Sequence, residues 1–207
     1  MNQTISVVAA LMFATFCGVA HSQNAISDLE SEIESGRISL EAIHGNGSSS
    51  GMAIEAVIRN TTGKPLRLNT NLRRPIYLGN RSSRSSQNMI AFSVYGRGGS
   101  YYSDGDNAFI EVAPNKEMDI EMIAYCADYD KDNPSSADQF DISRMPPQIE
   151  RASEKIAAYK RNNPDVDVLK AAQVALWLAQ GVSAEKIQTT FPFSPNEEAV
   201  AREILEP

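Results

Sequence analysis

Apolar residues alternate with polar ones over several short stretches in the first half of the chain, and this pattern predicts β-strands. Ile38, Leu40 and Ala42 alternate, and after the turn GNGSSSG the alternation resumes from Met52 to Ile58. Clusters of Gly, Ser, Asn, Pro and Asp separate the further predicted strands, at 66–72, 75–78, 89–95, 109–112 and 118–126. Seven or eight short strands without a helix-length pattern between them predict an antiparallel β-sandwich of immunoglobulin-like form.

The spacing becomes helical on both sides of this region. A short first helix is predicted from Ser27, which with Glu30 resembles a capping box, to Gly36. Four helices are predicted after residue 145, over 146–161 and 163–181 and behind the capping residues Ser183 and Ser194. The predicted class is therefore α+β, with a sandwich followed by a small C-terminal helical subdomain.

The first 22 residues have the composition of a secretory signal. They contain no charged side chain, they are apolar from Ile5 to Phe16, and Ala20 and Ser22 have the spacing of a cleavage site. The missing basic residue before the apolar run leaves an uncleaved anchor as the alternative. No later segment approaches the roughly 18 apolar residues of a membrane span. We therefore expect a secreted or periplasmic protein with a signal peptide (1–22), a short helix plus sandwich (23–126), an acidic, Pro-rich linker (127–147) and a helical subdomain (148–207).

Few residues remain for redox, metal or triad chemistry after the signal is removed. Cys126 is then the only cysteine and His44 the only histidine, so neither a disulfide framework nor a usual zinc ligand set is available. We expect no cofactor, apart from the calcium alternative below.

The net charge of −7 hides an uneven distribution. Residues 56–103 hold eight of the 19 basic residues and no Asp or Glu, so the rest of the chain carries 11 basic and 26 acidic residues, or −15. This stretch, called the basic segment below, ends in a predicted hairpin tip rich in Tyr, Gly and Ser, which are frequent in binding loops. An anionic ligand, a glycan or a surface protein is the predicted partner, and the candidate ligand residues are Arg73, Arg74, Tyr95, Arg97, Tyr101 and Tyr102. The alternative is that these arginines face the acidic remainder of the same molecule, while nucleic acid is not expected for an exported, acidic protein.

Two groups of aspartates carry weaker hypotheses. Asp128, Asp130 and Asp132 have the spacing of the first ligands of a calcium loop, but Asn133 replaces its glycine and Gln139 its closing glutamate, so a solvated linker is the alternative. Asp104 and Asp106 could act as a carboxylate pair in a glycan hydrolase, although two acids in a Gly-containing turn usually only form the turn. A binding module is favoured over an enzyme.

Cys126 offers the sharpest chemical hypothesis. It continues the row Ile120, Met122, Ala124 of the last predicted strand, so an inert core thiol is one interpretation, and an intermolecular disulfide is another. Gln173 lies in the apolar helical sequence AAQVALWLA, where a buried amide needs a partner. If that helix docks over the strand end, the thiol could attack the amide, expel ammonia and form a thioester that a nucleophile later opens.

The sequence Tyr125-Cys126-Ala-Asp128, followed by Gln173-Val-Ala175-Leu-Trp177, resembles the paired motifs of bacterial thioester domains. The resemblance implies covalent capture of amines on a surface, with Cys126 and Gln173 as the reacting pair. It covers about a dozen residues and the order of strands before helices. The chain departs from the family in the short spacing of 47 residues, in a sandwich that precedes the cysteine and in the lack of a stalk or wall anchor.

Overall fold

The computed structural model describes residues 25–82, 87–104 and 107–206, and it has an α+β fold. The expected signal peptide, Arg84 and Asp106 lie outside the described residues. The strands are β1 (Ile26–Ser27), β2 (Ile38–Gly45), β3 (Ser50–Asn60), β4 (Leu66–Asn69), β5 (Asn71–Asn80), β6 (Met89–Gly96), β7 (Tyr102–Asp104), β8 (Asn107–Val112), β9 (Glu117–Cys126) and β10 (Phe140–Ile142). The helices are α1 (Leu29–Glu34), the 3₁₀ turn η1 (Arg97–Gly99), α2 (Pro147–Asn162), α3 (Leu169–Ala179), α4 (Ala184–Thr190) and α5 (Pro195–Leu205). In the described part of the chain no helix is long and apolar enough to cross a membrane.

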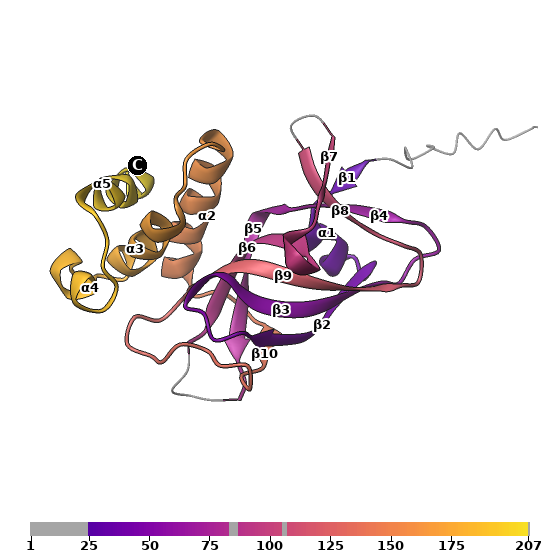
Figure 1. Cartoon of the computed structure of the whole chain (residues 1–207), viewed down its shortest axis with the longest axis horizontal. Coiled ribbons are helices and arrows are strands. Elements are labelled where there is room, and N and C mark those ends of the chain that lie inside the picture. The colour runs from indigo at the N-terminus through magenta and orange to yellow at the C-terminus, as the bar shows by residue number, and fades with distance from the viewer. Residues whose placement is uncertain (1–24, 83–86, 105–106, 207) are drawn as a thin grey trace, which may run out of the picture.

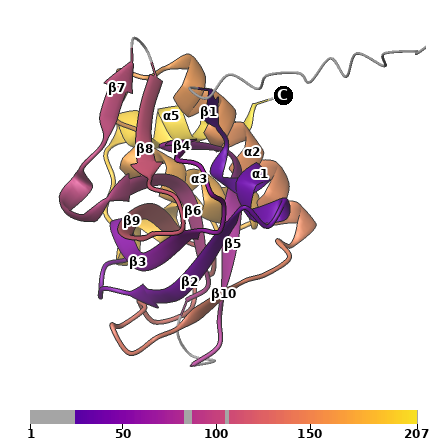
Figure 2. The ribbon, with the colours of Figure 1, turned by 90° about the vertical axis from the view of Figure 1, so that its right-hand side faces the viewer.

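The strands form two sheets that are mostly antiparallel. The larger sheet has the order β10-β5-β6-β9-β3-β2, and the smaller has the order β1-β4-β8-β7, in which only the two-residue β1 runs parallel to its neighbour. Figure 1 shows the strands gathered on one side of the molecule and α2 to α5 on the other, and Figure 2 shows the same elements after a 90° turn. The predicted order of strands first and helices afterwards is confirmed, whereas the immunoglobulin-like form stays a prediction.

One hydrophobic core joins the sheets to the helices. Ile54 and Ile58 of β3, Val94 of β6 and Met122 of β9 are fully buried, and the same cluster continues into Ile156 and Leu176 of the helices. Among the helices, α2 packs on β5, and α3 packs on α2 and α5. The helical subdomain therefore shares its core with the larger sheet.

Several local predictions are confirmed by the geometry. The turn GNGSSSG joins β2 to β3 in an antiparallel pair, with Ile38 opposite Asn60. Ser183 caps α4, and Ser194 with Glu197 forms a complete capping box at α5. The two caps were predictable because the groups that form them lie within three residues of each other, and the turn was predictable because it joins two strands that are adjacent in sequence.

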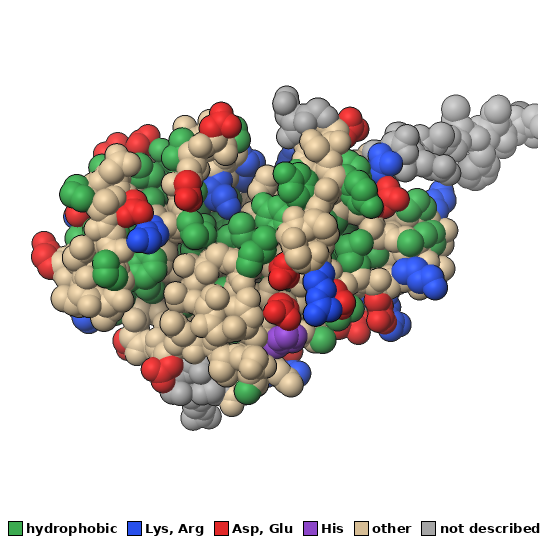
Figure 3. Space-filling model, viewed as in Figure 1, with side chains coloured by type: hydrophobic (Ala, Val, Ile, Leu, Met, Phe, Trp, Pro, Cys, Tyr) green, Lys and Arg blue, Asp and Glu red, His purple; other side chains and the backbone are tan. Residues whose placement is uncertain are grey.

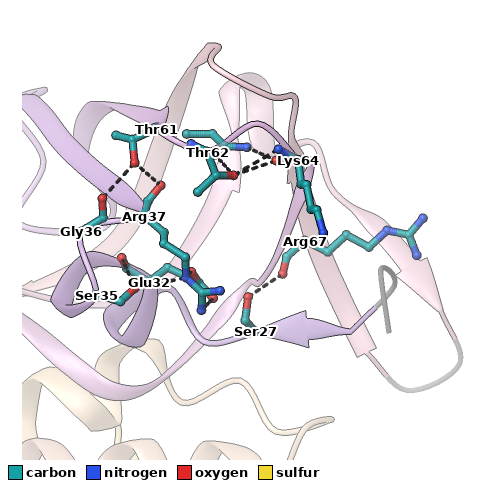
Figure 4. A network of polar contacts seen from close by, with 10 residues as sticks. Ser27, Glu32, Ser35, Gly36, Arg37, Thr61, Thr62, Lys64 and Arg67 are labelled. Carbon is teal, nitrogen blue, oxygen red and sulfur yellow. Dashed lines mark hydrogen bonds and ion pairs between the residues drawn. The ribbon is translucent and has the colours of Figure 1, made fainter. Parts of the chain in front are cut away.

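The predicted capping box at Ser27 is wrong. The N-cap of α1 is Asp28, and its side chain makes no capping hydrogen bond. Ser27 lies in β1 and donates through Oγ to the carbonyl oxygen of Arg67, as Figure 4 shows. The same view shows Arg37 bound to Glu32 and Thr61 donating to the carbonyl oxygens of Gly36 and Arg37, so contacts with distant strands, rather than a local cap, fix this helix.

The acidic, Pro-rich segment 127–147 contributes a strand that the sequence pattern did not predict. Phe140, which is buried, pairs with Asn80, and β10 thereby becomes an edge strand of the larger sheet. Asp138 in the same segment accepts hydrogen bonds from the backbone and hydroxyl groups of Ser135. The segment is thus packed on the sheet over part of its length.

Candidate functional site

The end of β9 and the middle of α3 meet and bring Cys126 next to Gln173. Helix α3 is apolar on nearly all sides, so most of it is buried. Ala171, Ala172 and Ala175 are among its buried residues, and their small side chains allow the helix to approach the strands closely. We call Cys126, Gln173 and Gln180 with their contacts the β9–α3 junction.

Two hydrogen bonds join the Gln173 side chain to the backbone of Cys126. The Cys126 N–H donates to Oε1 of Gln173 at 2.8 Å, and Nε2 of Gln173 donates to the Cys126 carbonyl oxygen at 2.9 Å. The ladder between β3 and β9 ends one residue earlier, at the pair Ser50–Tyr125. The side-chain amide of Gln173 therefore takes the place that the next residue of β3 would occupy beside Cys126. Because its oxygen and its nitrogen both have hydrogen-bond partners, the amide can be buried without loss of hydrogen bonding.

The Cys126 thiol is free, and its residue is almost fully buried. The Sγ atom donates to the carbonyl oxygen of Ser49, at 3.1 Å, in the turn between β2 and β3. Burial and, to a smaller degree, the charge of Asp128 raise the pKa of the thiol from 9.0 to about 12. At neutral pH the sulfur is thus protonated and enclosed by protein.

A second glutamine repeats the contact in a weaker form. Gln180, which follows α3, donates through Nε2 to the carbonyl oxygens of Ala127 and Leu176, both at 2.9 Å. Gln180 is half-buried, whereas Gln173 has no exposed surface. The two glutamines therefore hold consecutive carbonyl groups of the strand end.

The arginines proposed as ligand residues make ion pairs with acidic residues of the same chain. Arg73 lies 3.4 Å from Asp28, Arg74 lies 2.8 Å from Glu34, and Arg97 lies 3.5 Å from Asp119. Three more arginines of the basic segment are paired in the same way: Arg59 with Glu117, Arg67 with Glu111 and Arg81 with Asp141. Figure 3 shows basic side chains interspersed with acidic ones on the face in view. The charge separation along the sequence is largely cancelled in space.

The six candidate ligand residues fall into two separate groups. Arg73 and Arg74 of β5 lie beside α1, whereas Tyr95 lies near the end of β6, Arg97 begins η1, and Tyr101 and Tyr102 lie just before and at the start of β7. Tyr95 makes an edge contact with Tyr101, with ring centroids 5.9 Å apart, and Tyr102 stacks on Phe109 at 5.5 Å. Tyr101 and Tyr102 are 55% and 61% exposed, which is high for aromatic side chains. The residues predicted to form one long hairpin tip instead link the two sheets, because β6 pairs with β5 and β9 whereas β7 pairs with β8. This β6–β7 connection presents aromatic surface, and Arg73 and Arg74 lie outside it, on β5.

The aspartates of the calcium hypothesis have different surroundings. Asp128 accepts hydrogen bonds through Oδ2 from the backbone and side-chain nitrogens of Asn88, and it pairs with Lys131 at 3.1 Å. Asp130 and Asp132 are exposed. Among the described residues, no group of three or more His, Cys, Asp or Glu side chains is arranged to hold a metal ion. Asp104 of the hydrolase hypothesis is exposed as well.

Two residues near these sites were not predicted from the sequence. Ser49 covers the thiol, but it belongs to a glycine-serine turn whose composition suggested only flexibility. Lys160 ends α2 with Nζ 3.4 Å from Oγ of Ser93 and 5.9 Å from the ring centre of Phe92. Its position could not be predicted because it depends on how α2 lies across the larger sheet.

Searches of family models, curated proteins and solved structures found no match to this chain.

Proposed function

We propose that this chain is an exported binding module that captures amine-bearing targets through an internal thioester between Cys126 and Gln173. The observation that carries the proposal is the contact of the fully buried Gln173 amide with the backbone of the residue that holds the thiol. A backbone N–H that donates to Oε1 would also stabilise negative charge on this oxygen when sulfur attacks. Burial of both residues would protect the product from water.

The reaction needs no further reagent. The Sγ of Cys126 forms a bond to Cδ of Gln173, the Cδ–Nε2 bond breaks, and the thiol proton leaves with the nitrogen as ammonia. An amine of the target later attacks Cδ, the S–Cδ bond breaks, and the chain is left with a new amide and a free thiol.

Two features of the site set the conditions for this reaction. The thiol must rotate away from the Ser49 carbonyl oxygen before it can reach Cδ. The raised pKa leaves little thiolate at neutral pH, so we expect slow formation of the bond. A slow step is sufficient because each molecule forms the bond only once.

The intact mass of the exported protein tests the proposal. We expect a mass lower than that of the cleaved sequence by one ammonia, and addition of one methylamine when that amine is supplied. The variants Cys126→Ala and Gln173→Ala should show neither change, while Gln180→Ala should behave as the wild type.

Methylamine is required for a firm assignment. If the signal is cleaved after Ser22, Gln23 becomes the first residue and can lose ammonia by cyclisation to pyroglutamate. That product persists in Cys126→Ala and does not add methylamine, so the two sources are distinguishable. A wild type that adds no methylamine and has one alkylatable thiol after unfolding would refute the thioester.

The exposed tyrosines favour non-covalent recognition as a second candidate function. We propose that the sheets form an immunoglobulin-like scaffold and that the connection between β6 and β7, which carries the exposed tyrosines, binds a glycan or an anionic surface. Rigid aromatic area that is already exposed requires little ordering on binding. The double substitution Tyr101→Ser and Tyr102→Ser should abolish binding to a glycan array or an anionic bead. Variants in which Arg73 and Arg74 are neutralised serve as controls, because these two residues lie beside α1. Equal binding by all of these variants would exclude the β6–β7 connection as the binding site.

A further inference from the structure

A cavity of about 310 Å³ lies between α1, β5, β10 and the first turns of α2. This cavity, called the α1–α2 recess below, is close to the lower limit of volume for small-molecule sites. Its lining includes Ile33, Ile76, Tyr77 and Met145, so much of the wall is apolar. None of its lining residues belongs to the β9–α3 junction, so what it binds does not depend on the thioester.

Two buried polar atoms of its lining residues lack partners within the described chain. Glu30 is 6% exposed and accepts hydrogen bonds from the backbone N–H groups of Arg73 and Arg74 through Oε1, at 3.0 and 2.9 Å. Its other oxygen, Oε2, has no hydrogen-bond partner among the described residues, and neither has Oγ of the fully buried Ser153. Buried polar atoms in native proteins are normally paired, and an unpaired one costs about 1–3 kcal/mol. A bound group that donates hydrogen bonds would remove this cost.

The charge of the lining selects the kind of donor. Four glutamates (Glu30, Glu34, Glu150 and Glu154) and two arginines (Arg74 and Arg144) line the recess, which gives −4 + 2 = −2. Arg74 is already paired with Glu34 at the surface. Arg74 also attracts the buried Glu30 carboxylate through its charge, so Glu30 is compensated in part, and the lining as a whole stays net negative.

We propose that the α1–α2 recess binds a small organic cation, an ammonium, amidinium or guanidinium group carried on an apolar body. Oε2 of Glu30 and Oγ of Ser153 are closed off from solvent. The side chains that cover them therefore shift when the cation enters and donates to these two atoms, and the apolar body packs against Ile76 and Met145. A charge-assisted hydrogen bond of this kind contributes more than a neutral one, so a cation is preferred over an uncharged analogue of the same shape. The recess thereby differs from the basic segment, for which an anionic ligand is expected.

Titration of the wild-type protein with three ligands of nearly equal shape tests the charge preference. We expect measurable binding of benzamidinium by calorimetry or by NMR shifts of Ile33 and Ile76, and at least about tenfold weaker binding of benzamide and benzoate. A tripeptide with blocked ends and a central arginine is titrated in the same way. Binding of this peptide would show that the recess accepts a cation on a peptide side chain, whereas binding of benzamidinium alone would restrict the recess to free small cations. Equal affinity for benzamide and benzamidinium, or no binding of any of these probes, would overturn the proposal.

Matched variants test the residues. Glu30→Gln keeps an Oε1 acceptor for the two backbone N–H groups and removes the charge, and it should weaken benzamidinium binding by about tenfold or more. Ser153→Ala should weaken it several-fold, whereas Glu111→Gln, the same substitution on β8, should have no effect. An unchanged affinity in folded Glu30→Gln would also refute the site. Because these variants retain Cys126 and Gln173, their methylamine uptake reports independently on the thioester.

Discussion

The β9–α3 junction and the basic segment both rely on polar contacts between residues distant in sequence, but the contacts differ in kind. At the junction two uncharged amides bind backbone groups in the protein interior. In the basic segment charged side chains pair on the surface, and both partners of the Arg97–Asp119 pair are more than half exposed. Burial makes the first kind expensive to disrupt, whereas water and salt compete with the second. A contact at the junction therefore contributes more to the free energy of unfolding than an ion pair of the basic segment.

The largest effect is expected from loss of the Gln173 amide. Gln173→Ala leaves both backbone groups of Cys126 buried without a partner, and each such group costs about 1–3 kcal/mol. We expect the free energy of unfolding to fall by about 2–5 kcal/mol when Gln173→Ala is introduced into Cys126→Ala, a background that keeps the amide and cannot form the thioester, as measured by urea denaturation.

Gln180→Ala provides the matched control for this effect. It removes bonds to Ala127 and Leu176 from a half-buried side chain, where water can replace part of them. We expect a loss of about 1 kcal/mol. Equal losses for the two glutamines would mean that burial does not distinguish them.

The next effect is a loss of stability in alkali. Whenever Cys126 carries a thiol, as after opening by an amine, its pKa is about 12 in the folded chain and near 9.0 when it is unfolded. Between these values the folded chain binds more protons, so stability is complete below pH 9 and falls as pH rises, by up to about 1.4 kcal/mol per pH unit. Tyr77, whose pKa burial also raises to about 12, adds to the trend in all variants.

Comparison of the amine-opened wild type with Cys126→Ala isolates the contribution of the Cys126 thiol to the pH dependence of stability. Urea unfolding at pH 8, 9, 10 and 11 should give a steeper decline for the protein that holds the thiol. Parallel curves of unfolding free energy against pH would show that burial does not raise the pKa of the Cys126 thiol.

Lys160 combines features of both regions because it is a charged residue in partly buried surroundings. Burial lowers its pKa, and the charge of Asp167 offsets this in part. Below the lowered pKa the folded chain bears the full cost of the buried charge, so this contribution makes stability rise as pH increases toward the ordinary value of 10.5. We expect Lys160→Met to stabilise the protein at pH 7 by up to about 1 kcal/mol, because the methionine can keep the apolar packing of the stem.

Thermal unfolding of Lys160→Met at pH 7 and pH 10 tests this balance. The advantage over wild type should shrink at the higher pH, and Lys170→Met on the neighbouring helix is a surface control. A destabilised Lys160→Met at pH 7 would instead mean that the contacts with Ser93 and Phe92 outweigh the cost of burial.

Much of the fold could be predicted because its signals are local. Alternation marked β3, β9 and the start of β2, an apolar run between turn residues marked β6, and capping residues marked α4 and α5. The predicted row Ile38, Leu40, Ala42 breaks at a bulge after Glu41, so that Ala42 is exposed and Ile43 is buried instead. The contact of Cys126 with Gln173 was also within reach, since a lone amide in an apolar helix needs a partner and the strand that ends at Cys126 could supply one. What could not be predicted was which atoms meet, namely that the amide binds the backbone while the thiol binds Ser49.

The rest depended on pairings that no sequence window contains. Ser27 had the spacing of a cap, but the carbonyl oxygen of Arg67, 40 residues away, engages its hydroxyl. The charge asymmetry of the sequence suggested an open cationic surface, but arginines of the basic segment pair with acidic residues at α1 and in β8, β9 and β10. No sequence window contains these partners. The α1–α2 recess was equally hidden because α1, β5, β10 and α2 meet there only in the folded chain.

The smallest effects are expected from the surface ion pairs, and they decide whether the basic segment can still bind an anion. Arg67 and Glu111 are about one-third exposed, and the guanidinium lies 5.0 Å from the ring centre of Phe109, so a double-mutant cycle should give a coupling of about 0.5–1 kcal/mol. The more exposed Arg97–Asp119 pair should give less than about 0.3 kcal/mol, and both values should fall in 0.5 M salt. A near-zero coupling at Arg97 means that Asp119 restrains it little, so an anionic ligand at the β6–β7 connection could form an ion pair with Arg97 at small cost. A coupling above that of Arg67 would instead make Arg97 a structural residue and remove it from the candidate ligand set.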